Sequence, residues 1–193
     1  MRVIAGDWRG RKLAEPKGRE TTRPTTDRVR EACASMVDSA LEEGIEGARV
    51  LDAFAGSGAM GIEMLSRGAA HASFFDIDRA AASLVKRNLE SLGCSRSRFQ
   101  VCNGDVCLCA ARGRMAGAPF DLVLLDPPYA MSHEDVSALV ERLAESGLLA
   151  EAAVILYEHA AKDPSIDPAG FEPLRQKRYG STAVDLLVRL TGE

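Results

Sequence analysis

Residues 49–61 read Arg-Val-Leu-Asp-Ala-Phe-Ala-Gly-Ser-Gly-Ala-Met-Gly, and this stretch decides the fold. The apolar run 49–54 predicts a strand that leads directly into a glycine-rich turn, and we expect a helix from about Met60. Gly56 and Gly58 allow the backbone to turn sharply and to approach a ligand closely. The spacing Gly56-x-Gly58-x-x-Gly61 also satisfies the dinucleotide fingerprint, so the glycines alone leave the ligand open.

Short apolar runs continue to alternate with helical segments after residue 61. This alternation is typical of a parallel sheet that is covered by helices on both faces. We expect strands at about 49–54, 72–77, 99–103, 122–126 and 154–158, and helices from Asp27 and over 79–92 and 133–146. The segments 171–179 and 182–190 are expected to form an antiparallel hairpin joined at Gly180-Ser181.

Three acids lie near the carboxyl ends of the first three predicted strands. Asp52 precedes the glycine turn, where a carboxylate would repel a pyrophosphate but could bind the ammonium group of a methionine moiety. Asp76 comes about 20 residues later, where a ribose diol needs an acceptor, and Asp105 could accept from an adenine amine. The order of the acids favours S-adenosylmethionine. The predicted cofactor residues are Asp52, Phe54, Gly56, Gly58, Asp76, Ile77, Asp105 and Val106, and a valine at Gly58 is expected to project into the cofactor.

The fourth predicted strand ends in Asp126-Pro127-Pro128-Tyr129. An aromatic amine is a poor nucleophile, because its lone pair is delocalised into the ring. Asp126 and the Pro127 carbonyl could each accept one N–H bond from such an amine, and the two prolines would hold these acceptors rigidly. Tyr129 could then stack on the base. All four residues are therefore predicted to be catalytic, and the whole pattern predicts an α/β, Rossmann-like class I methyltransferase fold.

Charge is divided unevenly along the chain. Residues 1–30 contain nine Lys or Arg and four Asp or Glu, whereas the remainder contains 15 and 24. A basic segment on an acidic body predicts contact with a polyanion such as nucleic acid. We expect residues 1–26 to form a small basic β-hairpin arm and residues 27–193 the methyltransferase domain. The predicted RNA-binding residues are Arg9, Arg11, Lys12 and Arg23, and Trp8 could either contact RNA or pack the hairpin.

The sequence gives little sign of a metal or a membrane. Five cysteines show no paired ligand spacing and three histidines fit no zinc motif, so no metal is expected. No apolar run is long enough for a membrane span and no signal peptide is evident, so we expect a cytoplasmic protein.

Over nearly its whole length the chain resembles the RsmD family of 16S ribosomal RNA guanine-N2 methyltransferases. The resemblance is carried by residues 2–6, 8–13, 23–32, 52–58, 126–129 and 179–182, of which the N-terminal blocks are the specific part. The family usually has Glu where this chain has Asp76. The resemblance implies that the acceptor is the N2 amine of a guanine in 16S rRNA. It also implies that the partner is the small ribosomal subunit or its assembly intermediate.

Other interpretations remain open at this stage. An amino-methyltransferase acting on DNA adenine, DNA cytosine or protein glutamine would share the glycine turn and residues 126–129. A Rossmann-like RNA-binding protein without catalysis is disfavoured by the intact catalytic tetrapeptide. An NAD-dependent oxidoreductase is disfavoured because no obvious hydride-transfer acid or base is present.

Overall fold

The computed structural model describes residues 1–15 and 27–190, and the predicted RNA-binding residue Arg23 lies outside them. The described elements occur in the following order: α1 (Asp27–Ala40), β1 (Arg49–Asp52), α2 (Ala59–Ser66), β2 (His71–Asp76), α3 (Arg79–Leu92), a 3-10 turn (Arg96–Arg98), β3 (Phe99–Asn103), α4 (Val106–Ala111), β4 (Phe120–Leu125), α5 (His133–Glu145), β5 (Leu149–Ala160), β6 (Phe171–Tyr179) and β7 (Thr182–Arg189).

Seven strands form one sheet in the order β3-β2-β1-β4-β5-β7-β6. Strands β1 to β5 are parallel, and β7 runs antiparallel between β5 and β6. The predicted mixed sheet with a C-terminal antiparallel hairpin is confirmed. After β3, which lies at one edge of the sheet, the chain returns to the centre and forms β4 beside β1. The direction in which successive strands are added to the sheet therefore reverses between β1 and β4. Ligands of open α/β sheets bind at this reversal, beyond the carboxyl ends of the strands.

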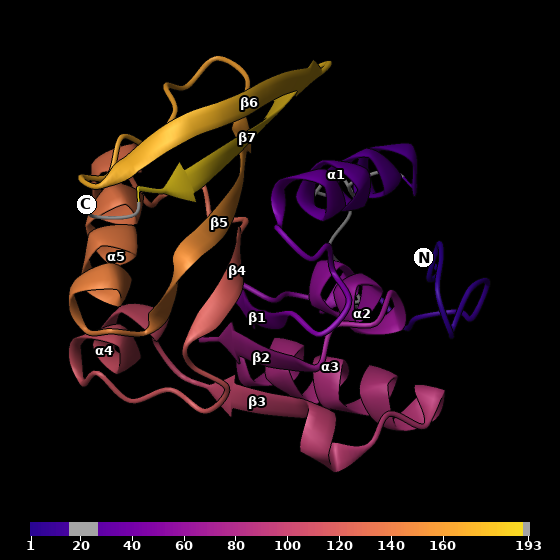
Figure 1. The fold of residues 1–193 in the computed structure, drawn as a ribbon. Coiled ribbons are helices and arrows are strands. Elements are labelled where there is room, and N and C mark those ends of the chain that lie inside the picture. Colours follow the sequence, from indigo (N-terminus) through magenta and orange to yellow (C-terminus); the bar gives the residue numbers. More distant parts are fainter. Residues whose placement is uncertain (16–26, 191–193) are drawn as a thin grey trace.

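Helices cover both faces of the sheet (Figure 1). The helices α1, α2 and α3 pack on one face, over a core that includes Val37, Leu65 and Leu89. The helices α4 and α5 cover the other face, over a core that includes Val140 and Leu143. Strands whose two faces are both covered are apolar along their length, which explains the continuous apolar runs of the sequence.

The N-terminal segment folds back on itself and docks on α2. The expected hairpin is reduced to one bridge between Arg2 and Lys12, closed by hydrogen bonds such as Val3 N–H to the Arg11 carbonyl (2.9 Å). The fully buried Glu63 carboxylate accepts the backbone N–H groups of Ile4 (2.8 Å) and Ala5 (3.0 Å). These bonds replace the pairing that longer strands would have made.

Two further contacts fix this docking. The Asp7 N–H donates to the Ser66 carbonyl over 2.8 Å, and Gly6 lies so close to that carbonyl that a Cβ would be 1.7 Å from its oxygen. Gly6 also has a φ of +78°, which favours glycine. Val3 and Leu13 are buried in the core under α1 and α2, so the arm packs as part of the main body.

Most predicted elements lie within a few residues of the observed ones. The strand β5 is longer than expected, since it begins at Leu149 rather than near 154. The short helix α4 has no counterpart among the explicitly predicted segments. Within the described residues, no helix is both long and apolar enough to cross a membrane.

Candidate active site

The predicted acids lie together at the carboxyl edge of the sheet. Asp52 ends β1 and Asp76 ends β2, while Asp105 follows β3 and Asp126 follows β4. These strands are adjacent and parallel, so the four carboxylates flank the point where the strand order reverses. The fold thus brings together side chains that are up to 74 residues apart in the sequence, between Asp52 and Asp126.

The glycine turn is held against β2. The Gly56 N–H donates to Asp76 Oδ2 over 2.8 Å, and the Ala55 N–H donates to the Phe75 carbonyl over 2.8 Å. A Cβ at Gly56 would meet no atom within 4 Å. The open side of the turn is therefore at Gly56.

The prediction that a valine at Gly58 would project into the cofactor is wrong. A Cβ at Gly58 would lie 3.0 Å from Val85 Cγ1 and 3.3 Å from Ile62 Cδ1, which are side chains of the core. Gly58 also has a φ of +76°. Its role in this structure is to permit the turn and the approach of α3, because a side chain there would enter the core and not the ligand space.

Asp52 is a buried carboxylate. Its Oδ2 atom accepts the Gly61 N–H over 3.1 Å. Burial raises the pKa of Asp52 to about 7; the Gly61 N–H opposes this shift, and the nearby charge of Asp76 adds to it. Asp52 forms no ion pair with any of the described residues.

The other predicted cofactor residues differ in how far their side chains are exposed and in which groups they already bind. Asp76 also accepts the Asp78 N–H over 2.8 Å, and Asp105 caps α4 by accepting the N–H groups of Cys107 (2.7 Å) and Leu108 (3.3 Å). Ile77 is 77% exposed, which is unusual for a large apolar side chain. The Val106 side chain is buried and the half-buried Phe54 packs against the same core.

The predicted catalytic tetrapeptide, residues 126–129, forms the exit from β4. Tyr129 is 84% exposed, and the Pro128 carbonyl accepts the Met131 N–H over 2.9 Å, which makes a tight turn. Asp126 is exposed to solvent, and the protein atoms near it partly desolvate its carboxyl group. Burial, then the charge of Glu158 and then that of Asp52 raise the pKa of Asp126 to about 7.

Glu158 is a site residue that sequence reasoning missed. Leu125 pairs with Tyr157, so Asp126 and Glu158 come next on the neighbouring strands β4 and β5. The sequence signal was weak, because Glu158 follows the apolar run of β5 without any motif. Only the strand order shows that this carboxylate lies beside Asp126.

The predicted RNA-binding cations have different environments. Arg9 and Lys12 are exposed, whereas the Arg11 guanidinium donates to the Ser91 carbonyl over 2.7 Å and helps to hold the arm on α3. Trp8 is half-buried, its backbone N–H donates to Ser66 Oγ over 3.0 Å, and the Arg98 guanidinium carbon lies 5.8 Å from the ring centroid. The contacts of Trp8 therefore favour packing of the arm.

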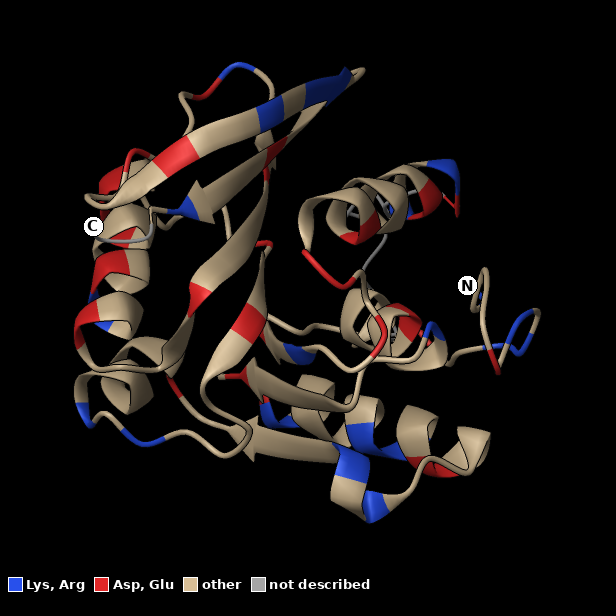
Figure 2. Cartoon of the chain, viewed as in Figure 1, with Lys and Arg blue, Asp and Glu red and all other residues tan. Residues whose placement is uncertain are grey.

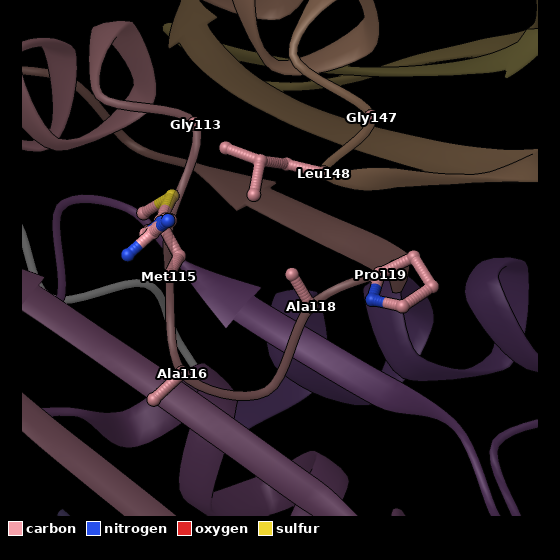
Figure 3. A pocket seen from close by; sticks show the side chains of 8 residues that line it. Gly113, Met115, Ala116, Ala118, Pro119, Gly147 and Leu148 are labelled. Atoms are coloured by element: carbon pink, nitrogen blue, oxygen red, sulfur yellow. The ribbon is translucent and has the colours of Figure 1, made fainter.

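A hollow of about 470 Å³ lies elsewhere, between the residues before β4 and those before β5 (Figure 3). Its lining residues include Met115, Pro119 and Leu148, which are at the amino ends of these strands. It is therefore at the sheet edge opposite Asp126. Among the described residues, no group of three or more His, Cys, Asp or Glu is placed to hold a metal ion.

The fold and the arrangement of acids and tetrapeptide define the class I methyltransferase type. Solved structures agree: that of yhhF from Escherichia coli has a TM-score of 0.81 at 33% identity, covering 100% of this chain and 99% of that chain. A profile of the family described as Conserved hypothetical protein 95 matches residues 1–188.

Curated relatives give the family its other name. Ribosomal RNA small subunit methyltransferase D of Escherichia coli is 36% identical over 191 residues, which are 98% of this chain and 90% of the relative. YlbH of Bacillus subtilis is 38% identical over 187 residues, covering 95% and 96%. The chain belongs to this RsmD family of ribosomal RNA methyltransferases, as the sequence motifs predicted.

Proposed function

We propose that this chain transfers a methyl group from S-adenosylmethionine to the N2 amine of a guanine in 16S ribosomal RNA. One observation carries the proposal: the buried Asp52 and the exposed Asp126 lie at the ends of the adjacent strands β1 and β4, and neither forms an ion pair among the described residues. S-adenosylmethionine carries a sulfonium and an ammonium group, so its charge complements this set of acids. A pyrophosphate would be repelled by it.

The residues of the carboxyl edge fit the parts of this cofactor. Asp52 would receive the ammonium group, directly or through water, and Asp76 the ribose hydroxyls. Asp105 would accept from the adenine amine, and the exposed Ile77 would cover the adenine ring. Gly56 leaves room for the close approach of the ligand. S-adenosylmethionine, when bound, supplies an electrophilic methyl group.

The tetrapeptide would prepare the acceptor amine. Asp126 and the Pro127 carbonyl would each accept a hydrogen bond from one of the two N–H groups of the amine. These two bonds would draw the nitrogen lone pair out of the base plane. The lone pair would then be directed at the methyl carbon, and as the N–C bond formed the C–S bond would break and the sulfur would leave as the neutral thioether of S-adenosylhomocysteine. Asp126 would accept the proton that the methylated nitrogen must lose. A carboxyl group whose pKa is near 7 is suited to hold that proton at neutral pH. The exposed Tyr129 would stack on the extruded base, a contact worth about 1–3 kcal/mol.

The name of the Escherichia coli relative points to small-subunit ribosomal RNA. We propose that this chain acts on that RNA within the small subunit or its assembly intermediate. Residues 1–26 would act as the RNA-binding arm of a methyltransferase domain at 27–193. Arg9 and Lys12 are the described arm cations best exposed for phosphates, while Arg23 is proposed from the sequence alone. The same assignment places the protein in the cytoplasm, where ribosomes assemble.

Substitutions at Asp126 test the proposal. Asp126→Ala removes one acceptor of the amine, so methyl transfer to small subunits is expected to fall about 100-fold or more. Asp126→Asn keeps one carbonyl acceptor and should retain more activity. Calorimetry should show S-adenosylmethionine binding in both variants. Glu43→Gln, on the exposed loop after α1, is the control and should behave as the unaltered protein. Unchanged turnover in Asp126→Ala would refute the catalytic assignment.

A further inference from the structure

The strand β6 carries an exposed basic group at one end. Arg175, Lys177 and Arg178 lie in its last five residues and are exposed, and in the described parts of the chain none of them forms an ion pair. Figure 2 shows the basic bands on the half of β6 nearest the turn to β7. We call these three residues the basic end of β6. It is distinct from the N-terminal arm.

Strand pairing places this basic end beside the catalytic edge. Asp126 is the neighbour of Glu158, which pairs with Val184, which in turn pairs with Lys177. Adjacent strands are about 4.8 Å apart, so the Lys177 backbone lies about 14 Å along this row from that of Asp126. Arg175 lies two residues before Lys177 on the same strand and pairs with Leu186.

The row also has a defined face. Val184 and Leu186 are buried under α1, and side chains opposite one another in a sheet lie on the same face. Arg175 and Lys177 therefore lie on the α1 side of the sheet. The exposed Arg28 at the start of α1 is near this row, since its charge opposes the increase in the Tyr179 pKa that burial causes.

An edge strand can carry charge for a different reason. The strand β6 is the outermost strand of the sheet, and charged side chains on such strands prevent pairing with another chain. Either sign of charge would serve that purpose. Here the charged residues in the half of β6 nearest the catalytic edge are all positive, on a chain whose formal net charge is -4, while Glu172 lies at the far end of the strand. This distribution is complementary to a polyanion at the catalytic edge.

We propose that the basic end of β6 binds phosphates of the RNA strand that flanks the target nucleotide. The proposal rests on the function proposed above and adds a second phosphate-binding surface to it. The arm and β6 would hold the RNA at two separate places while the base enters the site between them. Neither surface reads the base itself, because phosphate contacts position nucleic acid without reporting its sequence.

A double substitution tests this surface. In Arg175→Ala/Lys177→Ala, the slope of log affinity against log salt for unmethylated small ribosomal subunits should flatten by about 0.7 for each lost contact, and so by about 1.4. The KM for RNA should rise while kcat and S-adenosylmethionine affinity are retained. The matched control is Arg112→Ala/Arg114→Ala, which removes two exposed cations near the opposite edge. Arg175→Lys/Lys177→Arg should preserve the slope.

The outcomes separate the two proposals. If the unaltered protein methylates the RNA and the double variant binds it with an unchanged slope, the β6 surface is refuted and the proposed function stands. If the unaltered protein neither binds nor methylates the small subunits, both proposals are refuted. The remaining explanation is that the charges of β6 only prevent pairing of this edge strand with another chain, and sedimentation of the double variant tests it. If the variant lost RNA binding and also self-associated, the charges would be assigned to edge protection and the proposal would be overturned.

Discussion

The Gly56 N–H donates to Asp76 Oδ2 over 2.8 Å, so the acid that ends β2 also orders the turn that follows β1. Asp76→Ala should therefore weaken S-adenosylmethionine binding in two ways, by loss of the ribose acceptor and by release of the glycine turn. We expect a loss of affinity of about ten-fold or more, since one hydrogen bond to a charged group is worth about 1.5–3 kcal/mol.

Calorimetry with the purified protein measures this effect. Asp78→Asn is the matched control, because it removes a neighbouring charge and keeps an N-cap for α3, where Asp78 now accepts the Ala80 N–H. Asp76→Glu, which restores the residue usual in the family, should bind at least as well as Asp76→Ala. Full affinity in Asp76→Ala would exclude a contact with the ribose.

Stability should depend on pH through Asp52 and Asp126. Both acids have a pKa raised from 3.8 to about 7, so between about pH 4 and 7 the folded protein binds more protons than the unfolded chain. The free energy of unfolding contributed by these groups is therefore present at low pH and is lost as the pH rises through about 7. Urea unfolding across this range should show a smaller decline in Asp126→Asn than in the unaltered protein.

Cofactor binding should show the opposite dependence. A bound cation favours the ionised carboxylates, so S-adenosylmethionine affinity should rise with pH up to about 7, and binding near neutral pH should release protons. Calorimetry in buffers of different ionisation enthalpy measures that release. If stability and cofactor affinity depended on pH in Asp52→Asn and Asp126→Asn just as they do in the unaltered protein, the raised pKa values would be contradicted.

The arm should depend on Glu63 for its docking. The buried carboxylate accepts two backbone N–H groups of the arm and pairs with Arg67 over 2.9 Å. In Glu63→Gln one oxygen becomes a donor that faces another donor, so the free energy of unfolding should fall by about 2–4 kcal/mol. Denaturant unfolding measures this fall. Glu43→Gln should be neutral, and equal stability of the two variants would mean that the arm is held by other contacts.

Much of the fold was predictable because the sheet is covered on both faces. Apolar runs marked strands such as β1 and β4, and the glycine-rich turn indicated where α2 begins. The length of β5 was not predictable, because the exposed Glu151 and Ala152 interrupt its apolar pattern. The arm was predicted as a hairpin, but its backbone groups bond to Glu63 and Ser66, which lie far away in the sequence.

The site was predictable as far as motifs extend. Asp52, Asp76, Asp105 and Asp126 follow strands in a recognisable order, whereas Glu158 became evident only from the neighbouring positions of β4 and β5. The direction of a side chain at Gly58 could not be read from the sequence either. It depends on how α3 packs under the turn, which places Val85 where the new atoms would go.

The arm's contribution to RNA binding can be separated from its docking. Arg11 bonds to the Ser91 carbonyl, so its removal would disturb both. Arg9→Ala/Lys12→Ala avoids this problem and should flatten the salt dependence of binding to 16S rRNA by about 0.7–0.9 for each lost contact. The free energy of unfolding should stay unchanged. An unaltered salt slope would show that the arm is structural and that RNA binds elsewhere.

The chemical identity of the methylated atom tests the account most directly. Small ribosomal subunits from a strain that lacks this gene would be incubated with the purified protein and labelled S-adenosylmethionine, and the rRNA nucleosides analysed by mass spectrometry. We predict label in N2-methylguanosine at one position of 16S rRNA, and its loss with Asp126→Ala. Label in an adenine, a cytosine or a protein, or no transfer at all, would contradict the proposed function.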